Sequence, residues 1–209
     1  MLPYVVPFAI FIALSYLGTL FENGSYYFYP IKTIAVALTL FLYRQHYNEL
    51  RQRIRIQAIG MAAVVGFFVF VIWVVPEGWY PTLGTSEFNP FVFTDRTWIS
   101  WLIFFRLTGA VVVVPIFEEL FWRSFLIRWI INPDFNKVPL GQFSWLSFTL
   151  TVIFFGLEHH QWLVGIVAGV IYNLLVYWQK NLWACIIAHA VTNLALGIYV
   201  LHTGRWGFW

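Results

Sequence analysis

Long apolar segments recur along the whole sequence and leave room only for short polar connectors between them. Hydrophobic residues make up 61% of the 209 residues and charged residues 10%, whereas a soluble domain carries about a quarter charged residues. Because a membrane-spanning helix needs about 20 mostly apolar residues, the chain has room for about six or seven spans. We therefore expect an all-α, polytopic transmembrane helical bundle of about seven spans. It would form a single integral-membrane domain over residues 1–209. We expect this domain to contact the lipid bilayer and to bind no nucleic acid.

Seven apolar segments are candidates for these spans. The first lacks a basic amino-terminal region and a small-residue cleavage site, so we expect a retained span and not a signal peptide. The fourth would reach about 50 Å as one helix, so we expect it either to protrude from the bilayer or to be divided at Pro115, which should also kink it. The segments cover residues 3–21, 29–43, 56–75, 98–131, 144–160, 162–178 and 182–201.

Charged residues in the connectors predict the orientation of the chain. The connector after the second segment carries four arginines, and the connector at 76–97 is mainly acidic. Positively charged connectors stay in the cytoplasm, so the N-terminus is expected inside and the 76–97 connector outside. We expect a multi-pass protein of a bacterial cytoplasmic membrane. The four arginines are Arg44, Arg51, Arg53 and Arg55.

Two adjacent acidic residues, Glu118 and Glu119, lie inside the fourth segment, where a charge at membrane depth is costly. Glu119 and Arg123 are four residues apart, so they share a helix face and are predicted to form a structural ion pair. Glu118 points about 100° away around the helix and has no such partner. We therefore expect Glu118 to be the working carboxylate.

Polar side chains on two later segments complete a possible reactive set. His159 follows Phe155 by four residues near the end of the fifth segment, and His189 and Asn193 share one face of the seventh. His189 lies about eight residues into apolar sequence, too deep to reach the membrane surface easily. With Glu118, this set is sufficient to hydrolyse a peptide bond: a carboxylate activates water, one imidazole orients it, and imidazole and amide N–H groups stabilise an oxyanion.

The depths of Glu118 and His159 pose a geometrical problem. Each lies far along its own segment, and the two segments are expected to run in opposite directions through the bilayer. The two side chains can meet only if the fourth helix starts late, near Phe105, or if the fifth helix extends past His159. The neighbouring Glu158 is expected only to pair locally or to reach the membrane surface.

Three motifs resemble those of the CAAX-processing and bacteriocin-processing intramembrane proteases. Residues 118–123 read EELFWR and resemble the EExxxR motif, residues 155–159 resemble FxxxH, and residues 189–193 resemble HxxxN. Their order and spacing resemble the family core over about residues 101–199. The resemblance implies an intramembrane endopeptidase similar to the type II CAAX prenyl endopeptidases, which remove the last three residues of a prenylated C-terminal Cys-a-a-X protein.

The resemblance also implies roles for the motif residues. In the family, the residue matching Glu118 activates water with help from the one matching His159, and those matching His189 and Asn193 form the oxyanion site. The implied partner is a membrane-embedded or lipidated peptide or protein, with or without a prenyl group. No cofactor is favoured, because the type II enzymes are thought to act without a metal. If zinc is present, Glu118, His159 and His189 are its expected ligands.

Two other functions stay open from the sequence. Glu118, His159 and His189 are also suited to a proton or cation relay in a transporter or other ion-handling protein. Such a relay has little use for the Asn193 amide, so Asn193→Ala separates it from a protease. The other alternative is a non-catalytic immunity or scaffold protein, against which the three intact motifs argue.

Overall fold

The computed structural model describes residues 1–84 and 87–209, and within these residues it contains helices and connectors but no strand. The expected all-α fold is confirmed. The helices are α1 (Leu2–Thr19), α2 (Gly24–Tyr43), α3 (Ile56–Val74), α4 (Arg96–Thr108), α5 (Val114–Glu119), α6 (Ile127–Ile131), α7 (Trp145–Leu157), α8 (Trp162–Gln179) and α9 (Leu182–Thr203). Two π-helical turns, Gly109–Val113 and Leu120–Leu126, join α4, α5 and α6 into one continuous helix.

Six helical segments of the described chain are long and apolar enough to cross a membrane. They are α1, α2, α3, the continuous α4–α6 helix of 36 residues, α8 and α9. The seventh apolar segment forms α7, which has only 13 residues. At 1.5 Å per residue α7 is about 20 Å long, less than the roughly 30 Å hydrocarbon core. The bundle therefore has six helices of spanning length and one shorter apolar helix.

The long central helix runs through Pro115 without a break, so the expectation that Pro115 might divide it is wrong. Proline lacks the N–H that an α-helix uses and its ring crowds the preceding turn. Here the wider π turn at Gly109–Val113 ends two residues before Pro115, with Val114 between them. Such a turn shifts the hydrogen-bond pattern by one residue and lets the helix continue. The N–H of Val114 accordingly donates to the carbonyl of Gly109.

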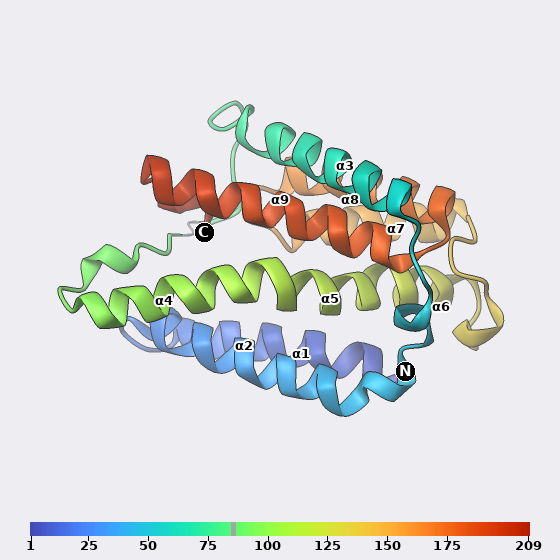
Figure 1. The fold of residues 1–209 in the computed structure, drawn as a ribbon, viewed down its shortest axis with the longest axis horizontal. Helices are drawn as coiled ribbons and strands as arrows, with labels where there is room; N and C mark the ends of the chain where they lie inside the picture. The colour runs from blue at the N-terminus through green and yellow to red at the C-terminus, as the bar shows by residue number, and fades with distance from the viewer. Residues whose placement is uncertain (85–86) are drawn as a thin grey trace.

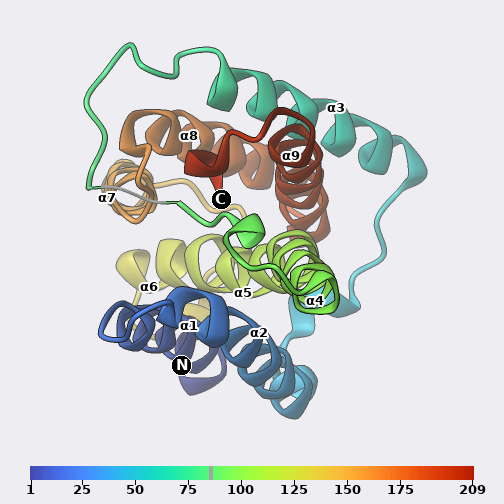
Figure 2. The same ribbon diagram turned by 90° about the vertical axis from the view of Figure 1, so that its left-hand side faces the viewer.

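The α4–α6 helix lies between two groups of helices (Figures 1 and 2). The α1–α2 hairpin packs on one side of it, and α3, α7, α8 and α9 lie on the other. On that side α3 packs along α9, where Gly66 lies directly against the backbone of Ala188. A side chain at position 66 would clash with that backbone, so glycine permits the close approach.

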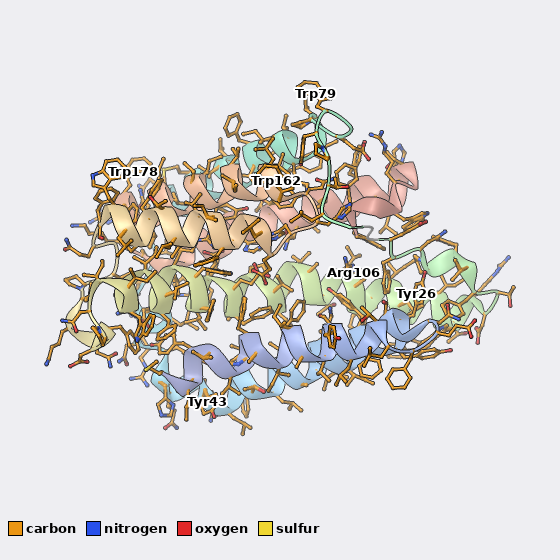
Figure 3. All side chains as sticks on the ribbon, turned by 180° about the vertical axis from the view of Figure 1, so that it is seen from behind. Tyr26, Tyr43, Trp79, Arg106, Trp162 and Trp178 are labelled. Carbon is orange, nitrogen blue, oxygen red and sulfur yellow. The ribbon has the colours of Figure 1, made fainter. Side chains whose placement is uncertain are left out.

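The α7–α8 hairpin brings His159 to the level of Glu118 by a route that the sequence did not predict. The long helix begins at Arg96 and not near Phe105, and α7 ends at Leu157, before His159. Neither expected condition is met. Because α7 is short, the tip of the hairpin lies partway along the bundle; Figure 3 shows Trp162, at the start of α8, well away from the end where Trp178 lies.

The connector between α3 and α4 covers this hairpin tip. The backbone N–H of Leu83 donates to the carbonyl of His160 at 2.9 Å, and Nδ1 of His160 lies 2.7 Å from the carbonyl of Leu83. The indole of Trp162 donates to the carbonyl of Pro81 at 3.0 Å. Loop backbone is thus hydrogen-bonded to the tip, which satisfies polar groups that lipid cannot.

The connector after α2 is anchored by a buried acid at the opposite end of the bundle. Glu49 forms an ion pair with Arg128 and accepts hydrogen bonds from Tyr4 at 3.0 Å and from Ser124 at 2.8 Å. Burial raises the pKa of the neighbouring Tyr47 phenol, whose hydroxyl donates to a backbone carbonyl of α1 at 2.7 Å. The arginine-rich connector is therefore fixed to α1 and to the far end of the long helix.

Candidate active site

A cavity of about 410 Å³ lies among the helices, and all four residues expected to carry the chemistry line it. Glu118 comes from α5, His159 from the α7–α8 connector, and His189 and Asn193 from α9. Segments far apart in the sequence therefore converge on one space within the bundle. A cavity that holds polar groups in apolar surroundings is the usual form of a small-molecule or peptide site.

Glu119 and Arg123 form the ion pair that their spacing predicts. Nε of Arg123 lies 3.3 Å from Oε2 of Glu119, and the two side chains are 1% and 0% exposed. The guanidinium also lies over the ring of Phe155, 4.1 Å from its centroid, and near that of Tyr172 at 5.3 Å. Aromatic faces and a carboxylate together compensate for the buried charge. The pair fixes the helix against its neighbours.

The imidazole of His189 lies between the two adjacent glutamates. Its Nδ1 is 2.9 Å from Oε1 of Glu119, and its Nε2 is 4.0 Å from Oε2 of Glu118. A carboxylate can only accept a hydrogen bond when ionised, so Nδ1–H is the donor to Glu119. Nε2 is then the nitrogen that faces Glu118. Sequence reasoning assigned Glu119 to Arg123 alone and missed this second contact, because no sequence spacing links α5 to α9.

A tyrosine on α8 packs against the face of the His189 ring. Tyr172 is stacked on His189 with ring centroids 5.4 Å apart and an interplanar angle of 24°. Its hydroxyl is 2.8 Å from the hydroxyl of Thr192, which donates to the carbonyl of Gly66 at 2.7 Å. The site is thereby tied to both α3 and α8. Tyr172 was not predicted, and a single tyrosine in an apolar segment carries no sequence signal of its own.

Hydrogen bonding assigns the two nitrogens of His159 different roles. Nδ1 lies 2.7 Å from the carbonyl of Phe155, which can only accept, so Nδ1–H is the donor. In the neutral ring Nε2 then carries a lone pair. The indole ring of Trp73, on α3, packs edge-on against the imidazole at 5.2 Å. His159 therefore presents a hydrogen-bond acceptor, and its ring is fixed on two sides.

Glu158 also lines the cavity. Its carboxylate accepts a hydrogen bond from the indole of Trp122 at 3.1 Å. Trp122 lies in the π turn after Glu119, 36 residues away, so the expectation of merely local pairing or of a surface position is wrong. A second acidic group thus lies near Glu118, and the carboxyl-rich part of the cavity is formed by two different segments.

Asn193 compensates for the irregular turn before Pro115. The carbonyl of Ala110 would pair with Val114 in an α-helix or with residue 115 in a π-helix. Val114 donates to Gly109 instead, and Pro115 has no N–H. The amide Nδ2 of Asn193 donates to this carbonyl at 2.7 Å. One amide hydrogen is used in this way, and Asn193 retains a second on the same nitrogen.

Of the three residues considered as zinc ligands, both histidines already face protein acceptors through Nδ1, the Phe155 carbonyl for His159 and Glu119 for His189. Over residues 1–84 and 87–209, no group of three or more His, Cys, Asp or Glu side chains is placed to hold a metal ion. Glu118 lies 4.0 Å from Nε2 of His189, and Nδ1 of His189 is hydrogen-bonded to Glu119. The Phe155 carbonyl orients the His159 ring, and the Glu119 carboxylate orients the His189 ring.

Two basic residues line the same cavity and were not predicted. Lys32 of α2 and Arg106 of α4 each lie inside an apolar segment. The signal that could have found them is the one that identified Glu118: a lone charge within a span is costly and usually functional. Figure 3 shows Arg106 on the long helix, on the side of the α1–α2 hairpin.

Residues 96–195 match the family model described as Rce1-like, type II CAAX prenyl endopeptidase Rce1-like. The matched range begins at the first residue of α4 and contains all three motifs, so the resemblance read from them is confirmed. The six long apolar helices indicate a multi-pass integral membrane protein, and over residues 96–195 the chain is similar to the type II CAAX prenyl endopeptidases. No curated protein and no solved structure gives a significant match to the chain.

Proposed function

We propose, since residues 96–195 match the Rce1-like family, that this chain is an intramembrane endopeptidase in which Glu118 activates water. The observation that carries the proposal is the arrangement of His189, whose Nδ1 is bound to Glu119 while Nε2 lies 4.0 Å from Glu118. That separation is too long for a direct hydrogen bond. Both residues line the same cavity, so Nε2 of His189 faces the space in which Glu118 would act on water and on a peptide carbonyl.

Glu118 has the surroundings that a general base needs. It is buried, lines the cavity, and its Oε2 has no hydrogen-bond partner among the described residues. In the proposed reaction, Glu118 takes a proton from water while the water oxygen attacks the peptide carbonyl. The protonated Glu118 then gives that proton to the leaving nitrogen as the C–N bond breaks. The second water proton stays on the new carboxyl group, which then ionises in water, and the leaving nitrogen becomes a free amine.

The hydrogen bonds support a division of labour between the two histidines. His159 donates through Nδ1 and offers an acceptor at Nε2, so it is suited to orienting the attacking water. Because Nδ1–H of His189 is donated to Glu119, only the doubly protonated ring can also donate through Nε2, and in that state His189 is suited to donating toward the oxyanion that forms from the carbonyl oxygen. The remaining amide hydrogen of Asn193 is the second oxyanion donor. These roles agree with those that the family resemblance implies.

A membrane-embedded or lipidated peptide is the proposed substrate. The cavity lies in a bundle of apolar helices, so its substrate must be presented within or beside the bilayer. We propose a bacterial cytoplasmic membrane with the N-terminus and the arginine-rich connector in the cytoplasm. The cavity is also lined by residues 207–209, and the C-terminus lies away from the N-terminal end of the bundle (Figure 1). With this orientation, the cavity lies toward the outer half of the membrane.

The test is incubation of the purified protein in lipid nanodiscs with a panel of prenylated and unprenylated membrane peptides, read by mass spectrometry. Glu118→Gln should abolish cleavage, and Glu22→Gln, on an exposed connector, is the matched control and should retain it. Cleavage that persists in the Glu118→Gln variant, or a purified protein that cleaves no peptide, would refute the proposal. Loss of cleavage in Asn193→Ala would in addition favour a protease over a proton relay.

A further inference from the structure

Glu158 is a second acid that lines the cavity around Glu118, and it belongs to none of the three sequence motifs by its own side chain. An indole N–H can only donate, and that of Trp122 donates to Oε2 of Glu158 at 3.1 Å. Trp122 follows Glu118 by four residues, which is about one helical turn, or roughly 5.4 Å along the axis. The Glu158 carboxylate is therefore held beside the long helix about one turn beyond Glu118.

The charge of Glu158 has no cationic partner. Among residues 1–84 and 87–209, no lysine or arginine forms an ion pair with it. Arg123 is bound to Glu119 at 3.3 Å. A carboxylate has about four acceptor positions, and the Trp122 indole uses one of them. A cationic ligand would therefore find both an uncompensated charge and open acceptor positions.

The two cations that line the cavity are held elsewhere. The Lys32 ammonium lies 4.7 Å and the Arg106 guanidinium 4.4 Å from the ring centroid of Tyr29 on α2. Neither of them forms an ion pair with Glu158. Basic groups and Glu158 thus share one cavity without direct contact.

A buried amide near Glu158 adds a second acceptor. Gln161 lines the cavity, is 8% exposed, and its Oε1 has no hydrogen-bond partner among the described residues. A buried acceptor without a donor is unfavourable. Glu158 and Gln161 are three residues apart in the connector between α7 and α8. This connector therefore offers an ionisable and a neutral acceptor to a ligand that is rich in donors.

We propose that Glu158 and Gln161 form a subsite for a basic side chain of the substrate, close to the cleaved peptide bond. This inference rests on the proposed endopeptidase function. Extended peptide advances about 3.3–3.6 Å per residue, so one helical turn corresponds to one or two residues. A lysine or arginine within two residues of a peptide bond at Glu118 can thus place its cationic group at Glu158. Charge-assisted hydrogen bonds to the carboxylate and one to the Gln161 oxygen would hold it there.

Binding to the Glu118→Gln variant tests the inference without any turnover. Two fluorescent single-span peptides of leucine and alanine are compared in nanodiscs of zwitterionic lipid. One has a lysine within its apolar stretch, and the other has N-acetyl-lysine there, which keeps the stem and removes the charge. The affinity ratio of the two peptides is measured with and without a second substitution, so that differences in their partition into the bilayer cancel.

The second substitution decides the outcome. We expect Glu158→Gln to lower the preference for the lysine peptide by about tenfold or more, because a charge-assisted contact is lost. Glu22→Gln, on an exposed connector, is the matched control and should leave the ratio unchanged. Glu158→Lys should reverse the preference, so that a peptide with glutamate at this position binds more tightly than one with glutamine. A ratio that Glu158→Gln does not change would overturn the inference.

Two further measurements keep the test decisive. Thermal unfolding shows which variants are folded, and if Glu158→Gln is not, Gln161→Leu should still lower the ratio by a few-fold; an unchanged ratio would contradict the subsite. The second measurement replaces sodium and potassium by N-methylglucamine at constant ionic strength. If the acceptors hold an inorganic cation instead, this exchange will lower the unfolding temperature of the wild-type protein and no preference for lysine will be found. That result would also contradict the inference.

Cleavage by the wild-type protein provides an independent reading. We expect the lysine peptide to be cut within two residues of its lysine, and moving the lysine by two positions should move the cut by two positions. A cut that stays at one position wherever the lysine stands would overturn the inference while leaving the proposed protease function intact. If no membrane peptide is cleaved at all, the protease function is refuted, and the binding comparison still tests the subsite.

Discussion

The imidazole of His189 is hydrogen-bonded to Glu119 through Nδ1 at a distance of 2.9 Å. Because Arg123 binds the same carboxylate, the ion pair and the orientation of the histidine depend on each other. The glutamate that the sequence marks as structural thus fixes the tautomer and direction of a ring that faces the reactive glutamate. Two adjacent acids have different tasks because one of them is already bonded on two sides.

Glutamine substitutions should separate these tasks. Glu118→Gln is expected to reduce peptide cleavage by about 100-fold or more, because a general base is lost, with little change in stability. Glu119→Gln is expected to lower the free energy of unfolding by about 3–5 kcal/mol, because Arg123 is left buried without its carboxylate. Cleavage rate and thermal unfolding of both variants in the same detergent measure the difference. Equal destabilisation by the two substitutions would contradict the assignment.

Removal of the Asn193 amide should affect turnover more than binding. Asn193→Ala is expected to reduce kcat by about 10²–10³-fold with KM nearly unchanged, the effect of losing one oxyanion donor. The carbonyl of Ala110 also loses its partner, so we expect a loss of about 1–3 kcal/mol in stability. Steady-state kinetics below the unfolding temperature distinguish the two effects. An unchanged kcat would argue against the oxyanion role.

Two substitutions of Tyr172 should distinguish its ring from its hydroxyl. Tyr172→Phe keeps the ring stacked on His189 and removes only the hydroxyl bond to Thr192, so activity should stay within a few-fold and stability should fall by about 1 kcal/mol. Tyr172→Ala leaves a void beside the imidazole and should cost about 3–5 kcal/mol and most of the activity. Kinetics and unfolding of the pair provide the measurement. A phenylalanine variant as inactive as the alanine variant would show that the hydroxyl, not the ring, matters.

Two glycines of α3 offer a matched test of helix packing. A Cβ at Gly66 would meet the backbone of Ala188, whereas one at Gly60 would have nothing within 4 Å. Gly66→Ala should therefore destabilise the protein by about 1–3 kcal/mol by separating α3 from α9. Gly60→Ala should be neutral or stabilising by up to about 1 kcal/mol. Thermal unfolding in one detergent compares them, and similar midpoints for both variants would contradict the close approach of α3 and α9.

Removal of metal should leave the activity unchanged. The proposed reaction proceeds through Glu118 and the two histidines, so dialysis against a strong chelator is expected to have no effect on the cleavage rate. The rate before and after dialysis, with metal content measured on the same sample, checks this. Activity that is lost on dialysis and restored by zinc would show that a metal takes part.

The sequence predicts those features that depend on local periodicity. Apolar segments of spanning length require helices, because only helices satisfy their own backbone in lipid, and the structure has them. The contact between Glu119 and Arg123 follows from helix geometry alone. The position of His189 deep in an apolar segment likewise indicates, from the sequence alone, that this residue has a function. Each of these conclusions needs only residues within one helix.

The tertiary structure decided what no single segment specifies. The length of α7 sets the depth of His159, the Asn193 amide pairs with a carbonyl released by a proline 78 residues earlier, and Lys32 joins Arg106 from another helix. Such contacts depend on how helices pack and cross, and packing is a property of several surfaces together. Sequence spacing thus determined that this chain forms membrane helices carrying reactive groups. Only the packing of those helices determined which groups share a cavity, because residues distant in sequence have no fixed geometry until the helices dock.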